Sequence, residues 1–121
     1  YEILRCLVGS EMCIRDSGIT NAITLLRGKL GHMVKIEVET RNLDEVAEAL
    51  HAGAEIIMLD NMSLEAMRKA VAMAKGKALI EASGGITLET LRPVAETGVD
   101  IISIGALTHS VKAFDISMKL V

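Results

Sequence analysis

Hydrophobic and polar positions along the chain follow two different periods. In residues 34–39 the side chains alternate, so that Val34, Ile36 and Val38 share one side of an extended strand and charged residues share the other. Residues 55–60, 78–83 and 100–104 contain apolar runs that are typical of strands buried on both faces. The pattern therefore predicts four strands, whose starts recur about every 20 residues.

Helical spacing fills the segments around these strands. The predicted helices cover residues 20–31, 42–53, 63–76 and 87–98. Each begins at a Thr, Asn or Ser, which are favoured N-cap residues, and ends at a glycine, which is favoured just after a helix. Pro93 lies inside the last of these helices and should kink it or delay its start. An alternation from Phe114 to Leu120 predicts a further edge strand.

Strands that alternate with helices predict an α/β fold with a parallel sheet or a barrel. A complete (β/α)₈ barrel takes about 250 residues. The chain has 121 residues, so we predict a partial (β/α) barrel of parallel strands alternating with helices, formed by residues 18–121.

Residues 1–17 show neither the alternation of a strand nor the apolar spacing of a helix. They also lack a capping residue at a position where a helix would begin. Their LVGSEMCIRD core resembles the translated adapter tails found in fragmentary gene sequences. We therefore expect this segment to be non-native and leave it out of the fold prediction.

Composition excludes several classes of function. The formal charge is −3 and aromatic residues make up 2% of the chain, so neither a basic surface nor stacking rings favour nucleic-acid binding. No apolar run approaches the ~18 residues of a membrane-spanning helix, and no secretory signal is visible. These features predict a cytoplasmic protein that binds neither nucleic acid nor membrane.

The stretch Glu81-Ala82-Ser83-Gly84-Gly85-Ile86-Thr87 carries the first chemical signal. A short apolar strand runs into two glycines, and Thr87 then stands in the N-cap position of a helix. Backbone N–H groups that precede a helix N-terminus attract anions, and glycines let a phosphate approach closely. The stretch predicts a phosphate site, although the same glycines would also suit a plain tight turn.

Acidic residues end two of the predicted strands. Sites in parallel α/β folds form at the carboxyl ends of strands. Glu39 and Asp60 would therefore lie at the same edge of the sheet as the Ser83 turn and the Gly105 turn. Two carboxylates can hold Mg²⁺ or bind sugar hydroxyls. The alternatives are that Glu39 is a solvated strand residue, that Glu37 takes its place, and that Asp60 only forms a turn. Glu81 receives no role, and a lone histidine such as His109 is usually a surface residue.

Four ordered stretches resemble quinolinate phosphoribosyltransferases, also called nicotinate-nucleotide diphosphorylases (carboxylating). The resemblance covers residues 18–121, and its stretches are KIEVE (35–39), IMLDNM (57–62), EASGGI (81–86) and IGALTHS (104–110). It implies the C-terminal part of an enzyme that makes nicotinate mononucleotide, pyrophosphate and CO₂ from quinolinate and phosphoribosyl pyrophosphate with Mg²⁺, in NAD biosynthesis. It also implies a homo-oligomer, either a dimer or a hexamer.

The resemblance also implies roles for individual residues. Glu39 and Asp60 are expected to be catalytic and to hold the metal, directly or through water. The 5′-phosphate is expected to bind Ser83, Gly84, Gly85, Gly105 and His109. The basic residues that hold quinolinate in the family lie before residue 18, so this chain alone is expected to be inactive. Alternatives are the molybdenum-transport-associated relative of the family, another phosphate-binding barrel enzyme, and a fragment that only binds phosphate.

Overall fold

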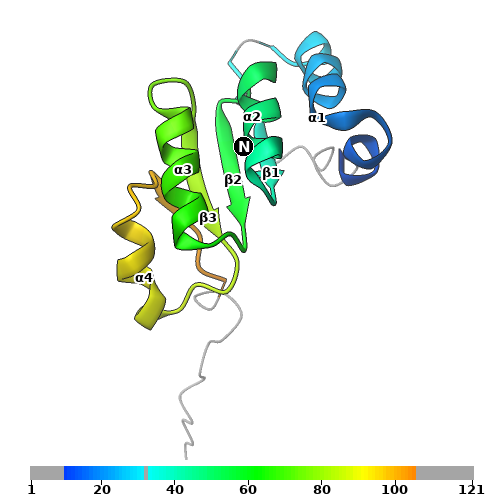
Figure 1. The fold of residues 1–121 in the computed structure, drawn as a ribbon. Helices are drawn as coiled ribbons and strands as arrows, with labels where there is room; N and C mark the ends of the chain where they lie inside the picture. Colours follow the sequence, from blue (N-terminus) through cyan, green and yellow to red (C-terminus); the bar gives the residue numbers. More distant parts are fainter. Residues whose placement is uncertain (1–9, 32, 106–121) are drawn as a thin grey trace, which may run out of the picture.

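The computed structural model describes residues 10–31 and 33–105, in which four strands alternate with four helices (Figure 1). No helix within these ranges is both long and apolar enough to cross a membrane. The predicted strand at 114–120 lies outside the described residues. The elements are α1 (Ser10–Lys29), β1 (Glu37–Thr40), α2 (Leu43–Ala52), β2 (Ile56–Asp60), α3 (Leu64–Ala74), β3 (Leu79–Ser83), α4 (Leu88–Ala95) and β4 (Ile101–Ile102).

The four strands form one parallel sheet in the order β1-β2-β3-β4. Helix α2 packs on β1 and β2, α3 packs on β3, and α1 packs on α2 (Figure 1). Consecutive parallel strands with helices between them are the repeating unit of a (β/α) barrel, whereas a doubly wound sheet reverses its strand order. This arrangement confirms the predicted α/β class and the partial barrel.

The hydrophobic core lies between the sheet and the helices. Its most buried large side chains are those of Ile57, Leu59, Ile80 and Val46. Because neighbouring residues of a strand face opposite ways, the remaining strand positions form a second face, which we call the open face. It carries Glu37, Glu39, Ile56, Met58, Asp60, Leu79, Glu81, Ser83, Ile101 and Ser103.

The apolar run in β2 predicts burial on both faces, and the structure corrects this. Ile57 and Leu59 are fully buried against the helices, whereas Ile56 and Met58 on the open face are only half-buried. Parallel strands are normally covered on both sides. The open face is therefore a surface that the described residues leave partly uncovered.

The predicted strand ends are close to the observed ones, except in β1 and β4. Strand β1 starts at Glu37 rather than Val34, because the N–H of Val34 bonds to the carbonyl of Gly31 in a turn at 3.1 Å. Strand β4 covers only Ile101–Ile102, although Asp100 and Ser103 each donate a 2.9 Å backbone bond to β3. Pairing thus continues past both ends of this short strand.

Three of the four predicted helix starts are confirmed by side-chain caps. Asn42, Ser63 and Thr87 accept hydrogen bonds from backbone N–H groups in the first turns of α2, α3 and α4. Gly53 ends α2 in the left-handed conformation, as predicted. Pro93 lies within α4 without delaying its start.

A helical segment does start after Gly18, close to the predicted Thr20, but Thr20 is not its N-cap. Helix α1 begins at Ser10 and bends at Gly18, whose φ of 77° and ψ of 162° are not helical. Thr20 lies after the bend, and its N–H and hydroxyl both donate to Oε1 of Glu48, at 3.0 and 3.1 Å. The non-native origin expected for residues 1–17 stays a prediction.

Candidate functional site

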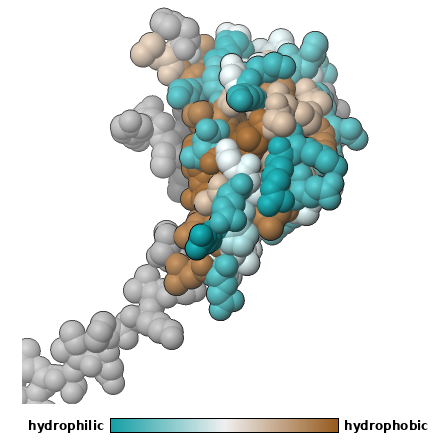
Figure 2. Space-filling model, turned by 60° about the vertical axis from the view of Figure 1, so that its left-hand side comes forward, coloured by the Kyte–Doolittle hydropathy of each residue, from teal (hydrophilic) through white to brown (hydrophobic). Residues whose placement is uncertain are grey.

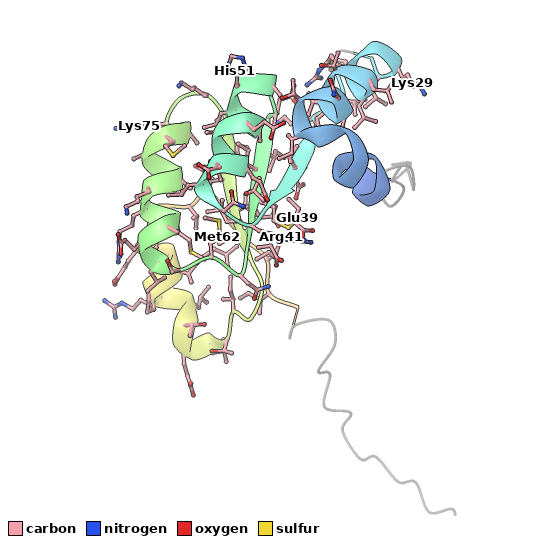
Figure 3. All side chains as sticks on the ribbon, turned by 45° about the vertical axis from the view of Figure 1, so that its right-hand side comes forward. Lys29, Glu39, Arg41, His51, Met62 and Lys75 are labelled. Atoms are coloured by element: carbon pink, nitrogen blue, oxygen red, sulfur yellow. The ribbon has the colours of Figure 1, made fainter. Side chains whose placement is uncertain are left out.

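The predicted acidic residues and the glycine turn lie at the same edge of the sheet. Asp60 and Ser83 end β2 and β3 and are opposite each other in the strand register. Glu39 lies on the same face of β1, opposite Met58, which precedes Asp60 by two residues. Figure 3 shows Glu39 at one end of the sheet, with His51 and Lys75 at the other end. Gly105 follows β4 and is exposed, and His109 lies outside the described residues.

The glycine turn has the backbone that a phosphate site needs. Gly84 and Gly85 have φ values of 90° and 60°, which L side chains rarely adopt. Their N–H groups make no hydrogen bond with any other residue that the structure describes. These two donors stand just before α4, so they can point at an anion near its positive end.

Part of the helix end behind this turn is already occupied. Thr87 and Thr90 form a capping box, in which the N–H of Thr87 donates to Oγ1 of Thr90 at 2.9 Å and the N–H of Thr90 donates back at 3.4 Å. The donors that remain for a ligand are therefore those of the turn itself, rather than the first N–H groups of the helix.

Glu39 has a cationic neighbour that the sequence analysis did not single out. The guanidinium of Arg41 lies 3.2 Å from Oε1 of Glu39. The hydrogen bond and the charge of Glu39 raise the pKa of Arg41, and the charge of Asp60 contributes to the same rise. Arg41 therefore lies within the field of both carboxylates, next to the Glu39 position in Figure 3.

The two carboxylates fit a magnesium ion that is also held by phosphates and water. Strand spacing puts the Cα atoms of Glu39 and Asp60 about 8 Å apart along a diagonal of the sheet. Mg²⁺ is commonly bound by one or two carboxylates together with substrate phosphates. No group of three or more metal-binding side chains occurs in the part of the chain that the structure describes. Any such ion would compete with Arg41 for Glu39.

Two further carboxylates lie deeper on the open face. Glu81 is only 8% exposed and accepts a hydrogen bond from the hydroxyl of Ser103 on β4. Burial, followed by the negative charge of Glu81, raises the pKa of Glu37. Glu37 is opposite Ile56 in the register, two residues nearer the amino edge than Glu39. The structure thus places Glu39, and not Glu37, beside the edge that carries Asp60.

Asn61 is a second residue at this edge that sequence reasoning missed. Its side chain lies between Asp60 and the glycine turn, where a Cβ on Gly84 would be only 2.5 Å from its Cγ. A cavity of about 380 Å³ opens beside it between the starts of α2 and α3. The Asp-Asn pair is an ordinary turn signal, and a contact with Gly84 on the next strand leaves no local mark in the sequence.

Comparison with known proteins gives consistent matches. The family model "Quinolinate phosphoribosyl transferase, C-terminal domain" matches residues 5–119. A probable nicotinate-nucleotide pyrophosphorylase (carboxylating) of Bacillus subtilis (strain 168) is 47% identical over 102 residues, which cover 84% of this chain and 35% of that protein. The solved nicotinate-nucleotide pyrophosphorylase of Francisella tularensis has a TM-score of 0.77 and 45% identity, covering 85% of this chain and 37% of that one.

A second solved structure supports the same conclusion. NadC from Streptococcus pyogenes has a TM-score of 0.78 and 40% identity, and the match covers 88% of this chain and 38% of that chain. The chain therefore spans little more than a third of the length of these relatives. Because the family model covers nearly all of it, the chain belongs to the quinolinate phosphoribosyltransferase family, and it corresponds to that family's C-terminal domain.

Proposed function

We propose that this chain is the C-terminal part of an enzyme that transfers the phosphoribosyl group of phosphoribosyl pyrophosphate to quinolinate. The products are nicotinate mononucleotide, pyrophosphate and CO₂. The relatives described above carry the name nicotinate-nucleotide pyrophosphorylase. The observation that carries the proposal is that Glu39, Asp60 and the Ser83-Gly84-Gly85 turn lie at one edge and on one face of the sheet.

The glycine turn is proposed to bind the 5′-phosphate of the sugar. Gly84 and Gly85 offer two backbone N–H groups, and their positive φ values give a turn of the kind that binds anions. Ser83 adds a hydroxyl at the end of β3, and Gly105 lies after the next strand. His109 is proposed to assist, on the strength of the family resemblance.

Glu39 and Asp60 are proposed to stabilise the transition state. Substitution at ribose C1 develops positive charge on the ring, and fixed carboxylates beside the ring favour that charge. Both residues face the same side of the sheet as Ser83, so a ribose anchored by its phosphate can reach them. A magnesium ion bound with the substrate would neutralise charge on the departing pyrophosphate, with Glu39 and Asp60 as its protein ligands.

Binding of the second substrate, quinolinate, needs basic residues that the site described here does not supply. Quinolinate is a dicarboxylate, and Arg41 is the one cation that the described structure pairs with a site carboxylate. The family resemblance assigns quinolinate to basic residues that precede residue 18. A homo-oligomer, dimer or hexamer, and a cytoplasmic location are parts of the same proposal.

The test uses a chimaera that joins residues 18–121 to the preceding part of the Bacillus subtilis relative. We expect pyrophosphate release from phosphoribosyl pyrophosphate only when quinolinate is added. Asp44→Asn, an exposed acid in the first turn of α2, serves as a control that should leave this release unchanged. Release that depends on nicotinate and not on quinolinate would reject the proposed substrate.

A further inference from the structure

We propose that Asn61 is a positioning residue that fixes the Asp60 carboxylate relative to the Ser83-Gly84-Gly85 turn. This inference rests on the proposed function and adds a residue to it. Asn61 would keep the group that acts at ribose C1 at a constant distance from the group that holds the 5′-phosphate. Three separate contacts of Asn61 support this role.

Two of these contacts are hydrogen bonds. The backbone N–H of Asn61 donates to the carbonyl of Ser83 at 3.0 Å, which joins the end of β2 to the end of β3. The side-chain Nδ2 donates to Oδ1 of Asp60 at 2.7 Å. A bond to one carboxylate oxygen fixes the plane of the group without occupying its other oxygen. The same residue thus holds Asp60 on one side and the start of the glycine turn on the other.

The third contact is steric. A Cβ built on Gly84 would lie 2.5 Å from both Cγ and Oδ1 of Asn61 and 2.6 Å from Nδ2. The amide group therefore rests directly on the Cα of Gly84. Turning the amide over would leave this contact unchanged, but it would put an oxygen against the Asp60 carboxylate, where two acceptors repel. The orientation with nitrogen toward Asp60 is the one that satisfies both neighbours.

The backbone of Asn61 adopts an unfavourable conformation, which the contacts described above hold in place. Its φ is 53°, and it is the only residue other than glycine with positive φ among those the structure describes. The left-handed conformation is unfavourable for an L-residue, and Asn tolerates it better than most because its short side chain can bond locally. Strain of this kind persists where surrounding contacts hold it and is concentrated at functional sites.

The consequence for catalysis is a separation between binding and rate. Misplacing a catalytic group by about 1 Å can cost about 100-fold in rate. The N–H groups of Gly84 and Gly85, by contrast, belong to the turn and would remain able to hold a phosphate. Losing the Asn61 amide should therefore lower kcat much more than it raises KM for phosphoribosyl pyrophosphate.

The test compares Asn61→Gly with Gly84→Ala in the chimaera described above. Glycine keeps the left-handed backbone and removes only the amide, so we expect kcat to fall about tenfold with KM changed less than about threefold. Gly84→Ala should instead raise KM strongly, because its Cβ clashes with Asn61 and because a φ of 90° is strained for any L side chain.

Two results would overturn the positioning role. One is a kcat of Asn61→Gly within about twofold of the parent, and the other is an Asn61→Gly variant whose KM for phosphoribosyl pyrophosphate rises as much as its kcat falls. A parent chimaera that releases no pyrophosphate with quinolinate would instead count against the proposed function. In that event, ¹⁵N NMR of the asparagine-labelled chimaera still tests the contact: the Asn61 side-chain signals should move with Asp60→Asn, and unmoved signals would reject it.

Discussion

The guanidinium of Arg27 lies 2.5 Å from Oε1 of Glu55, which joins α1 to the residue that precedes β2. The other carboxylate oxygen of Glu55 accepts the backbone N–H of Ile36 at 2.7 Å. Arg27 also donates to the carbonyl of Val34 at 3.1 Å. One ion pair thus ties together the first helix and the entries to two neighbouring strands.

Glu55→Gln should destabilise the fold above the ordinary pKa of a glutamate. Partial burial acts to raise the pKa of Glu55, but hydrogen bonds from Arg27 and Ile36 outweigh it and lower the pKa below 4.5. A carboxyl group whose pKa is lowered in the folded state stabilises the fold at pH values above its ordinary, unfolded-state pKa. This stabilisation is lost as the pH falls through the lowered pKa. Because the side chain is 38% exposed, we expect a loss of about 1 kcal/mol at pH 7.

Urea unfolding of the chimaera with and without Glu55→Gln, followed by circular dichroism at several pH values, measures this difference. The exposed pair between Lys69 and Glu65 provides the control, since Lys69→Ala should change the stability much less than Glu55→Gln does. Equal stability of Glu55→Gln and the parent at pH 7 would show that the Arg27 pair contributes nothing to the fold.

Glu37→Gln should have the opposite effect. Burial and then the charge of Glu81 raise the pKa of Glu37 in the folded chain. The folded state therefore binds this proton more tightly than the unfolded state, so stability falls as pH rises from 4.5 through the raised pKa. We expect Glu37→Gln to be more stable than the parent at pH 7 and equal to it below pH 4.5.

Carboxyl ¹³C NMR can follow the titration of Glu37 directly. Glu81→Gln is the matched variant, because it removes the second cause and can still accept the hydrogen bond from Ser103. The pKa of Glu37 should move back toward its ordinary value in that variant. An unmoved titration would mean that Glu81 does not act on Glu37.

Asp60→Asn in the chimaera should lower kcat by about 100-fold while the affinity for phosphoribosyl pyrophosphate changes little. The side chain keeps its shape but loses the negative charge that is proposed to stabilise charge at ribose C1. Steady-state pyrophosphate release gives both constants. A kcat equal to that of the parent would indicate that Asp60 only shapes the turn after β2.

Much of the fold could be predicted because its signals are local. The N-cap of α2 at Asn42 and its glycine end at Gly53 lie within twelve residues, and one period of apolar residues connects them. Local signals also predict the ends of β1 and β2: the predicted end at Asp60 is confirmed, and the predicted end at Glu39 is one residue before the observed Thr40. The bend at Gly18 was missed because Thr20 looks like an ordinary cap, and its real partner, Glu48, lies 28 residues away.

Two features of the site that could not be predicted depend on contacts between strands. Leu79 and Ile80 are both large and apolar but lie on opposite faces of β3, so the run from Ala78 to Ser83 does not show that Glu81 faces away from the helices. The contact of Asn61 with Gly84 exists only because β2 and β3 end side by side. The roles assigned to Glu39, Asp60, Ser83, Gly84, Gly85, Gly105 and His109 stay predictions.

The open face and the outer strands bear on how the chain behaves alone. Leu79 and Ile101 on that face are 38% and 36% exposed, and apolar residues also reach the surface among polar ones in Figure 2. Within the described ranges β1 and β4 each have one neighbour, so their outer N–H and C=O groups are available for pairing. Exposed apolar faces and strand edges both promote association.

We therefore expect the 121-residue chain, expressed alone, to associate and to be catalytically silent. Replacing Leu79 and Ile101 with threonine should reduce the association, because both changes remove exposed apolar surface from the open face. Catalysis should be absent because nothing in the described site is arranged to hold a dicarboxylate beside ribose C1. Analytical ultracentrifugation and a pyrophosphate-release assay test the two halves. A monomer with one sharp unfolding transition would contradict the first half, and quinolinate-dependent release would contradict the second.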